Sequence, residues 1–432
     1  MERLAKHLLV ISFDAISKKD FEFVKTLPNF RNFLGEASYS KDVKSINPTL
    51  TYPAHTSIIT GTYPNKHGIF TNTLLQPKRL KSPDWYWYRK DVKVDTLYDL
   101  AVRNKMRVSS QLWPVAAGAK IQYNFPEIFA NRKYKKQLFV SMMNGSPVYQ
   151  IKLFNKFGNL LEGIEQPNLD DFVHQGLLYT IKNYKPDLML VHFTDLDSMR
   201  HYYGYDSIQA KESIERHDKR LGEIIQTLKD EKIYEDTTII LLGDHGHIAT
   251  KYVVSINKLF EEKGFLKTKD EKIIYWDAIT KSNDGSIYVY CKDEDVRKKV
   301  RVLLDEFKAS TDAVREIYTK EQIIEMKMQS DADFLLDANP GYYFNDRLEA
   351  KVINEVEMDG KKVKKGYLLS SHGYLTNHQD YETLFMISGK GIKRNFEIGS
   401  MSLVDEAPTM AKILGLTMKD VDGRVLEEIF EI

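Results

Sequence analysis

The chain alternates short apolar runs with longer segments whose apolar residues recur every three or four positions. The run Leu8 to Phe13 is uninterrupted, as in a strand that is buried on both faces. Ser207 to Glu231 places its apolar residues at helical spacing, and the β-branched run Thr237 to Leu242 follows it. This alternation predicts an α/β fold, with a mostly parallel central sheet that carries helices on both faces.

The same pattern continues along most of the chain. Acidic residues follow three of the expected strands: Asp14 after Phe13, Asp195 and Asp197 after Phe193, and Asp244 after Leu242. Ligands of open α/β sheets bind at this carboxyl edge. The remaining expected core elements are helices over 96–105, 169–184 and 403–414 and strands over 107–113, 187–193 and 383–388.

From about residue 251 to residue 366 the pattern changes. An alternating strand over 285–290 precedes an amphipathic helix over 293–307, and residues 357–365 form a charged hairpin or loop. We interpret 251–366 as an α+β cap subdomain inserted into the core. The core then comprises residues 1–250 and 367–432.

Composition excludes several classes of protein. Lys+Arg 62 against Asp+Glu 61 gives a net charge of +1, so no bulk field attracts a nucleic-acid polymer or anionic lipid. Cys291 is the only cysteine, which rules out an internal disulfide and a thiolate metal site. No apolar stretch approaches the roughly 20 residues of a membrane span. We therefore expect no membrane partner and a cytoplasmic location.

Carboxylates and imidazoles gather in three separated clusters, and a hydroxyl residue, Thr51, lies in a Pro-bounded turn ahead of them. A helix would put Asp197 and His201 on one face. Singly, each such residue is more often a capping or hydrogen-bonded side chain, but together they predict two sites for Zn²⁺ or a similar first-row ion. The expected sites are Asp14, Asp244 and His245 for one ion, and Asp197, His201 and His372 for the other.

These residues resemble the nucleotide pyrophosphatase/phosphodiesterase family of the alkaline phosphatase superfamily. The resemblance extends from Phe13-Asp14 to the helix at Leu403. It implies an alkaline phosphatase-like fold and two divalent ions, Zn²⁺ before Mn²⁺ or another first-row ion. The matched positions are Asp14, Thr51 before Tyr52-Pro53, Asn72, Asp197, His201, Asp244, His245 and His372.

The resemblance also implies a mechanism. Thr51 is expected to be both a metal ligand and the nucleophile, and to pass through a phospho-threonine intermediate. Asn72 and the Thr51 backbone N–H would stabilise a non-bridging oxygen. Two ions with three carboxylates leave about one positive charge, which suits a diester. A small-molecule phosphate ester or a nucleotide is the expected partner.

Several residues carry two interpretations. Arg200 stands where the family usually has Gly, and it either faces solvent or reaches a substrate anion. Tyr52 either stacks on a planar leaving group or packs the turn. The aromatic run Trp85 to Tyr88 either packs or forms a substrate wall. Asp195 could compete with Asp197 as a ligand, and Thr376 replaces a frequent Pro. His55, His67 and His247 are expected to be structural or to support the ligands.

Three functional hypotheses follow. The first is a two-metal phosphodiesterase or nucleotide pyrophosphatase. The second is a phosphomonoesterase or phosphonate hydrolase of the same superfamily. The third is a non-catalytic protein that binds metal or a phosphate ligand on the same fold. Six intact ligand positions favour an enzyme.

Overall fold

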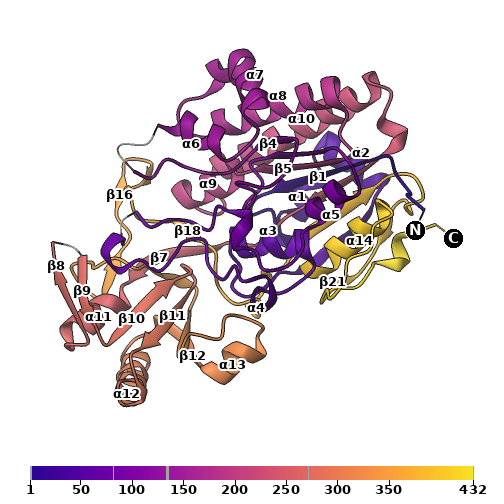
Figure 1. Cartoon of the computed structure of the whole chain (residues 1–432). Coiled ribbons are helices and arrows are strands. Elements are labelled where there is room, and N and C mark those ends of the chain that lie inside the picture. Colours follow the sequence, from indigo (N-terminus) through magenta and orange to yellow (C-terminus); the bar gives the residue numbers. More distant parts are fainter. Residues whose placement is uncertain (1, 81, 133–135, 271, 432) are drawn as a thin grey trace.

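The computed structural model describes residues 2–80, 82–132, 136–270 and 272–431. Its centre is a nine-stranded sheet in the order β20-β2-β19-β6-β1-β5-β3-β4, with β21 beside β2 (Figure 1). The five strands from β6 to β4 are parallel, whereas β19 is antiparallel to both of its neighbours. The strands are β1 (His7–Phe13), β2 (Ser38–Lys44), β3 (Val108–Gln111), β4 (Tyr123–Phe125), β5 (Leu188–Phe193), β6 (Thr237–Leu242), β19 (Thr383–Ser388), β20 (Phe396–Glu397) and β21 (Ser400–Ser402).

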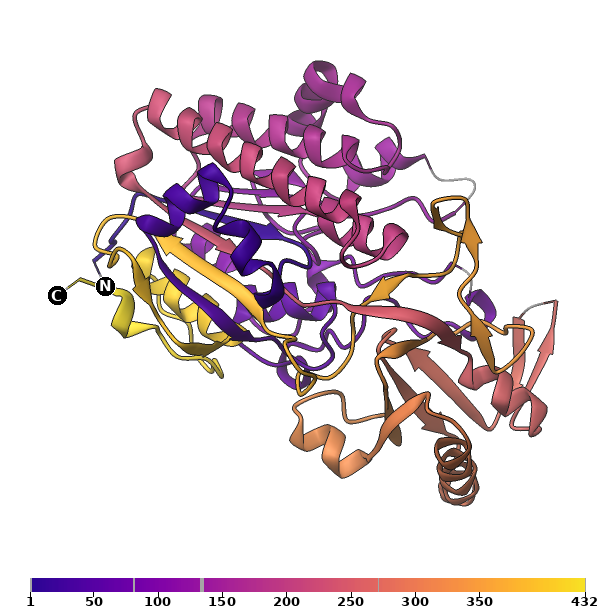
Figure 2. The same ribbon diagram turned by 180° about the vertical axis from the view of Figure 1, so that it is seen from behind.

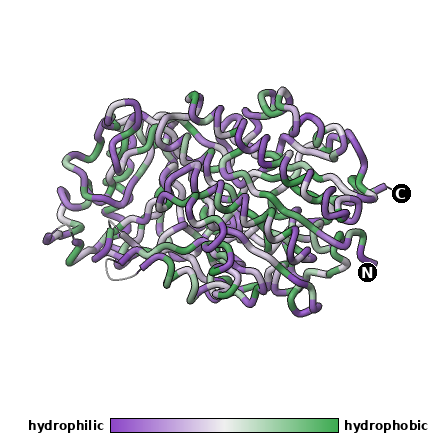
Figure 3. Tube along the Cα trace, turned by 90° about the horizontal axis from the view of Figure 1, so that it is seen from above, coloured by the Kyte–Doolittle hydropathy of each residue, from purple (hydrophilic) through white to green (hydrophobic). Residues whose placement is uncertain are grey.

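Alternate residues of the central strands enter two cores, one on each face of the sheet. In β1, Leu8 and Val10 belong to one cluster, while Leu9 and Ile11 belong to the other. Figure 2 shows helices on both faces, and Figure 3 shows hydrophobic positions gathered in the interior. The predicted α/β fold is therefore confirmed. The helices of the core include α2 (Pro28–Gly35), α3 (Thr51–Thr60), α5 (Leu97–Arg103), α7 (Pro147–Phe157), α8 (Asn168–Tyr184), α10 (Ile208–Asp230) and α14 (Glu406–Ile413).

The parallel register brings three strand ends to one edge of the sheet. Phe13 pairs with Phe193, and Ser12 pairs with Leu242, so the residues after these strands emerge side by side. Asp14 and Asp244 follow β1 and β6, and α9 (Asp195–Tyr203) begins one residue after Thr194 at the end of β5. The expected grouping of polar residues at this edge is confirmed.

Strand β7 (Ile248–Val254) leads from the core into a second region with sheets of its own, seen at the lower left of Figure 1. This region has a separate hydrophobic cluster, which also receives Tyr374 and Tyr381 from the returning chain. The division at residues 250 and 367 stays a prediction. The elements here are α11 (Ile256–Glu262), β8 (Leu266–Lys269), β9 (Lys272–Trp276), β10 (Ala278–Ser282), β11 (Ser286–Cys291), α12 (Glu294–Ser310), β12 (Val314–Thr319), α13 (Lys320–Glu325), β13 (Phe334–Ala338), β14 (Gly341–Phe344), β15 (Ile353–Glu355), β16 (Met358–Asp359), β17 (Lys362–Val363) and β18 (Ser370–Ser371).

Two smaller expectations have clear outcomes. The charged segment at 357–365 is a hairpin, because β16 pairs with β17 in antiparallel register. No helix within the described ranges has both the length and the apolar character needed to cross a bilayer.

The central strands set the stability of the edge that carries the polar residues. Ile240 is fully buried and lies between Val10 of β1 and Ile387 of β19. Ile240→Ala is expected to lower the free energy of unfolding by about 2–5 kcal/mol, because it leaves a cavity. Ile274→Ala, at a position 59% exposed, should change it by no more than about 0.5 kcal/mol. Denaturant unfolding of both variants checks this expectation, and equal effects would contradict it.

Candidate metal centre and nucleophile

The first group of side chains joins the ends of β1 and β6. His245 Nε2 lies 3.4 Å from Asp14 Oδ1 and 3.2 Å from Asp244 Oδ2. Both carboxylate oxygens are buried without a hydrogen-bond partner among the described residues. Two ligand atoms that bind one tetrahedral ion at about 2.0–2.2 Å lie about 3.3–3.6 Å from each other. These spacings and the two unpaired oxygens fit a divalent cation.

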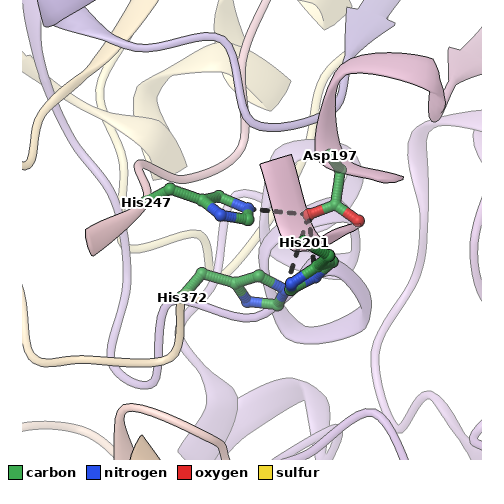
Figure 4. A group of neighbouring side chains, drawn as sticks. All are labelled: Asp197, His201, His247 and His372. Atoms are coloured by element: carbon green, nitrogen blue, oxygen red, sulfur yellow. Dashed lines mark hydrogen bonds and ion pairs between the residues drawn. The ribbon is translucent and has the colours of Figure 1, made fainter. Parts of the chain in front are cut away.

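The second group surrounds Asp197 on α9. Its Oδ1 lies 3.2 Å from His201 Nε2, 2.8 Å from His247 Nε2 and 3.6 Å from His372 Nε2. Figure 4 shows the three imidazoles converging on this one oxygen. The predicted helical pairing of Asp197 and His201 is observed, and His247 joins the cluster.

The two groups are neighbours. The His245 and His372 rings stack with centroids 3.9 Å apart and planes at 14°. The structure thus brings together all six side chains that the sequence suggested as ligands. They come from four separate segments of the chain, which are the ends of β1, β6 and β18 and the helix α9.

The electrostatics of the two groups demand positive charge. Burial and then repulsion from Asp244 and Asp197 raise the pKa of Asp14 well above its ordinary value. Burial raises the pKa of Asp244 to about 6, and Asp197 adds to this effect. Burial lowers the pKa of His245 to about 3, so the imidazole is neutral at pH 7. A bound cation would keep these carboxylates ionised and would use the imidazole lone pair.

Thr51 borders the first group. It is the first residue of α3, so the Pro-bounded turn that we expected is the start of a helix, because Pro53 fits a first helical turn. Its Oγ1 lies 3.3 Å from His245 Nε2, and Thr51 is 8% exposed. The helix N-terminus adds partial positive charge beside this hydroxyl.

Asn72 faces the same helix start. Its Oδ1 accepts the Tyr52 N–H at 2.9 Å, and its backbone carbonyl accepts the Tyr86 N–H at 3.0 Å. Among the described residues, no hydrogen bond engages its Nδ2. The amide donors of Asn72 therefore remain free for an anion near Thr51.

A buried chain of hydrogen bonds supports Asp14 from behind. His192 Nε2 lies 3.0 Å from Asp14 Oδ2, and His192 Nδ1 lies 3.1 Å from Glu127 Oε2. The Tyr52 hydroxyl donates to Glu127 Oε1 at 3.0 Å. Sequence reasoning missed His192 and Glu127, and the one signal for His192 was a polar residue inside the apolar run of β5.

Comparisons with known proteins agree with this arrangement. A family description, type I phosphodiesterase / nucleotide pyrophosphatase, matches residues 8–375, which is most of the chain. The chain belongs to this family. The family is hydrolytic and acts on phosphodiester and pyrophosphate bonds, as the sequence resemblance implied.

Individual family members are similar over most of the chain. Ectonucleotide pyrophosphatase/phosphodiesterase family member 5 from Homo sapiens is 23% identical over 423 residues, which cover 96% of this chain and 76% of that protein. A bis(5'-adenosyl)-triphosphatase from Bos taurus is 23% identical over 95% of this chain and 78% of its own. The solved structure of human member 5 has a TM-score of 0.68 at 20% identity, and covers 99% of this chain and 100% of that chain. The mouse member 5, solved as an inactive variant with AMP, has the same TM-score at 18% identity, with the same coverage. These structures show the shared fold.

Arg200 was expected either to face solvent or to reach a substrate anion, and it does neither. It is 1% exposed, and its guanidinium donates to Ala15 O and Asp20 Oδ1 and lies 4.0 Å over the Tyr205 ring. It therefore neither faces solvent nor is directed at a substrate, because a buried carboxylate takes its charge. The competing ligand candidate Asp195 is also engaged, in a bidentate pair with Arg216 at 2.7 and 3.0 Å.

Tyr52 is packed rather than open to a ligand. It is fully buried, and its ring lies 5.2 Å from Trp85 in a cluster that contains the aromatic run 85–88. The interpretation of Tyr52 as a stacking platform for a leaving group is wrong, because its hydroxyl and both ring faces are already inside the protein. Trp85 to Tyr88 likewise pack on the segment that carries Thr51.

Two positions near the candidate ligands have clear structural roles. Gly243, next to Asp244, is required for space, because a Cβ there would lie 2.2 Å from both Ile16 O and Thr383 Oγ1. The Thr376 N–H donates to Asn47 Oδ1 at 2.9 Å, which a proline at this position could not do.

The three histidines that were expected to be structural or to support the ligands divide into two kinds. His55 lies 2.8 Å from both Ser12 Oγ and Thr51 O, and His67 Nε2 lies 3.0 Å from Ser57 Oγ, so both support the fold around α3 as expected. His247 differs from these two, because its Nε2 lies 2.8 Å from Asp197 Oδ1 and it joins the group around that carboxylate. Its spacing of two from His245, with Gly between, was the available signal.

The Arg200 pair predicts a stability effect without a loss of metal. Arg200→Ala leaves the buried Asp20 carboxylate unpaired and should lower the free energy of unfolding by about 3–5 kcal/mol. Arg103→Ala, whose pair with Asp95 is about half exposed, should cost no more than about 1 kcal/mol. Chemical denaturation and metal analysis of both variants test this. Unchanged stability with reduced turnover would instead place Arg200 at the substrate.

Proposed function

We propose that this protein is a divalent-metal-dependent hydrolase of phosphodiester or pyrophosphate bonds, with Thr51 as the nucleophile. Two ions would be held, one by Asp14, Asp244, His245 and Thr51 and the other by the group around Asp197. Zn²⁺ is the first choice, since mixed imidazole and carboxylate ligands suit it, followed by Mn²⁺ or another first-row ion.

One observation carries this proposal. The Thr51 hydroxyl, at the N-terminus of α3, lies 3.3 Å from the same His245 nitrogen that faces the unpaired oxygens of Asp14 and Asp244. A hydroxyl in such a place is poised to lose its proton when cations are present. A merely structural threonine would satisfy its hydroxyl within the helix, as Thr56 and Thr60 do by donating to carbonyls at 2.7 Å.

The bound ions, Thr51 and Asn72 have different roles in the proposed reaction. When bound, the ions would supply positive charge for the attacking, leaving and non-bridging oxygens. Thr51 Oγ1 gives its proton to solvent and attacks phosphorus, the bond to the leaving oxygen breaks, and that oxygen takes a proton from solvent. Water then cleaves the phospho-threonine and restores the hydroxyl. The Asn72 amide and the Thr51 backbone N–H donate to a non-bridging oxygen throughout.

Charge favours a diester or pyrophosphate bond over a monoester. A monoester dianion usually needs one more cation than a diester does. The one candidate for that role, Arg200, is paired with Asp20. We propose a nucleotide-like small molecule as substrate, which is supported by the name of the bovine triphosphatase and by the AMP in the mouse structure. A cytoplasmic location is kept as a proposal on the grounds of the single cysteine.

Metal content and activity test the proposal together. Protein reconstituted with Zn²⁺ or Mn²⁺ should hold close to two ions per chain and hydrolyse a nitrophenyl diester faster than the matched monoester. Chelation should abolish turnover, and added metal should restore it. One ion or none at saturation, or a preference for the monoester, would contradict the proposal.

Replacing the nucleophile separates chemistry from folding. Thr51→Ala should remove nearly all turnover, because no other hydroxyl replaces its oxygen, while Thr51→Ser should keep part of it. Thr56→Ala, which removes a hydroxyl one turn along the same helix, should stay active. Steady-state rates and metal content of the three variants are the measurements. An active Thr51→Ala variant would assign the attack to another group.

Asn72 is expected to act in the transition state. Asn72→Ala should lower kcat by about 10²–10³, the usual cost of losing one donor to a developing charge, with little change in metal content. Asn104→Ala removes an exposed amide that bonds the Leu100 carbonyl and serves as the control. An unchanged kcat in Asn72→Ala would mean that Asn72 only caps the Tyr52 N–H.

A further inference from the structure

We infer that His247 is a fourth protein ligand of the Asp197 metal site, in addition to Asp197, His201 and His372. The inference rests on the proposed function only in taking a divalent ion to bind there. It assigns a ligand that the sequence placed among the supporting histidines.

Hydrogen bonds fix which nitrogen of each imidazole is free. His201 Nδ1 lies 2.8 Å from the Ser370 carbonyl, and His372 Nδ1 lies 3.2 Å from the Thr49 carbonyl. A carbonyl oxygen only accepts, so Nδ1 carries the hydrogen in both rings. In their neutral forms, both Nε2 atoms therefore direct a lone pair at Asp197. This is the usual arrangement of metal-binding histidines.

Hydrogen bonds also show which nitrogen of His247 carries the hydrogen. Its Nδ1 lies 3.1 Å from Ser370 Oγ, and that hydroxyl donates its only hydrogen to the Ile248 carbonyl at 3.2 Å. Ser370 Oγ must then accept from His247 Nδ1–H. The Nε2 of a neutral His247 consequently carries a lone pair as well.

That lone pair cannot face Asp197 unaided. His247 Nε2 lies 2.8 Å from Asp197 Oδ1, and two acceptors at this distance repel each other. His247 is 2% exposed, so its ring is enclosed between Asp197 on one side and Ser370 on the other. A cation shared by the nitrogen and the oxygen removes the conflict.

One residue orients two of the three rings. Ser370 of β18 presents its carbonyl to His201 and its hydroxyl to His247, and β18 pairs with β7, so that Ser370 lies opposite Ala249. Such a shared partner holds both imidazoles towards one point, as Figure 4 shows for the rings themselves. A histidine that only filled space would not need this orientation.

The fourth ligand makes the two sites unequal. Three imidazoles and one carboxylate leave one positive charge on a divalent ion, whereas Asp14, Asp244 and His245 leave none before Thr51 binds. Before Thr51 binds, the Asp197 site has one protein ligand more than the other site, so it should fill first.

Two substitutions at one position test the role of His247. His247→Gln keeps a hydrogen-bond donor towards Asp197, and His247→Phe keeps only the ring shape. If His247 is a ligand, both variants should weaken the tighter ion by more than about 100-fold in chelator competition, beyond the 10–100-fold typical of supporting residues. His174→Gln serves as the control, because His174 pairs with Glu223 and belongs to neither candidate metal group. This variant should leave the affinity for the metal ion unchanged. A smaller effect, or full retention in His247→Gln, would overturn the inference.

Cadmium NMR of the wild-type protein counts the imidazole ligands directly, so a folding defect in a variant cannot imitate the result. In ¹⁵N-histidine-labelled protein loaded with ¹¹³Cd, one cadmium signal should couple to three imidazole nitrogens, and the coupling to one of them should vanish in His247→Gln. Coupling to only two nitrogens would overturn the assignment of His247 and leave the two-metal proposal intact. Absence of any bound ion in the wild type would instead contradict the proposed function itself.

Discussion

The structure around the candidate site depends on the electrostatic repulsion among three carboxylates that lie close together and largely out of water. Asp14 and Asp244 are buried at the end of two adjacent parallel strands, and Asp197 lies close enough to raise the pKa of both. Burying unpaired carboxylates is costly unless cations or donors compensate them. The two oxygens without hydrogen-bond partners leave room for a cation, the neutral imidazoles offer it lone pairs, and the N-terminus of α3 adds partial positive charge.

Buried hydrogen bonds hold the Asp14 carboxylate in place. Asp14 is held by the buried row His192, Glu127 and Tyr52, so Asp14, which follows β1, and Tyr52, the neighbour of Thr51, share one hydrogen-bonded support. His192 lies between two carboxylates, and both of its nitrogens donate. Burial alone would lower its pKa, but Asp14 and Glu127 raise it well above its ordinary value. A displacement of either end of this row would move both Thr51 and Asp14.

The second region of the chain completes the centre as well as covering it. The chain leaves the core through β7 and returns through β18, and this pair of strands holds His247 and His372 beside α9. The turn between β10 and β11 reaches back, with the Gly285 N–H donating to the His372 carbonyl at 2.8 Å. The second region therefore helps to hold the two candidate metal groups in place, and Tyr374 and Tyr381 pack into its hydrophobic cluster.

The sequence by itself determined the alternation of strands and helices, the carboxylates at strand ends and the six ligand residues, because these depend on local periodicity and on residues next to recognisable strand ends. Only the tertiary structure decided what Arg200, Tyr52 and His247 do. Arg200 and Tyr52 find their partners, Asp20 and Glu127, at long range, and no local pattern encodes such contacts. His247 became a ligand candidate because Ser370, more than a hundred residues away, turns its ring towards Asp197.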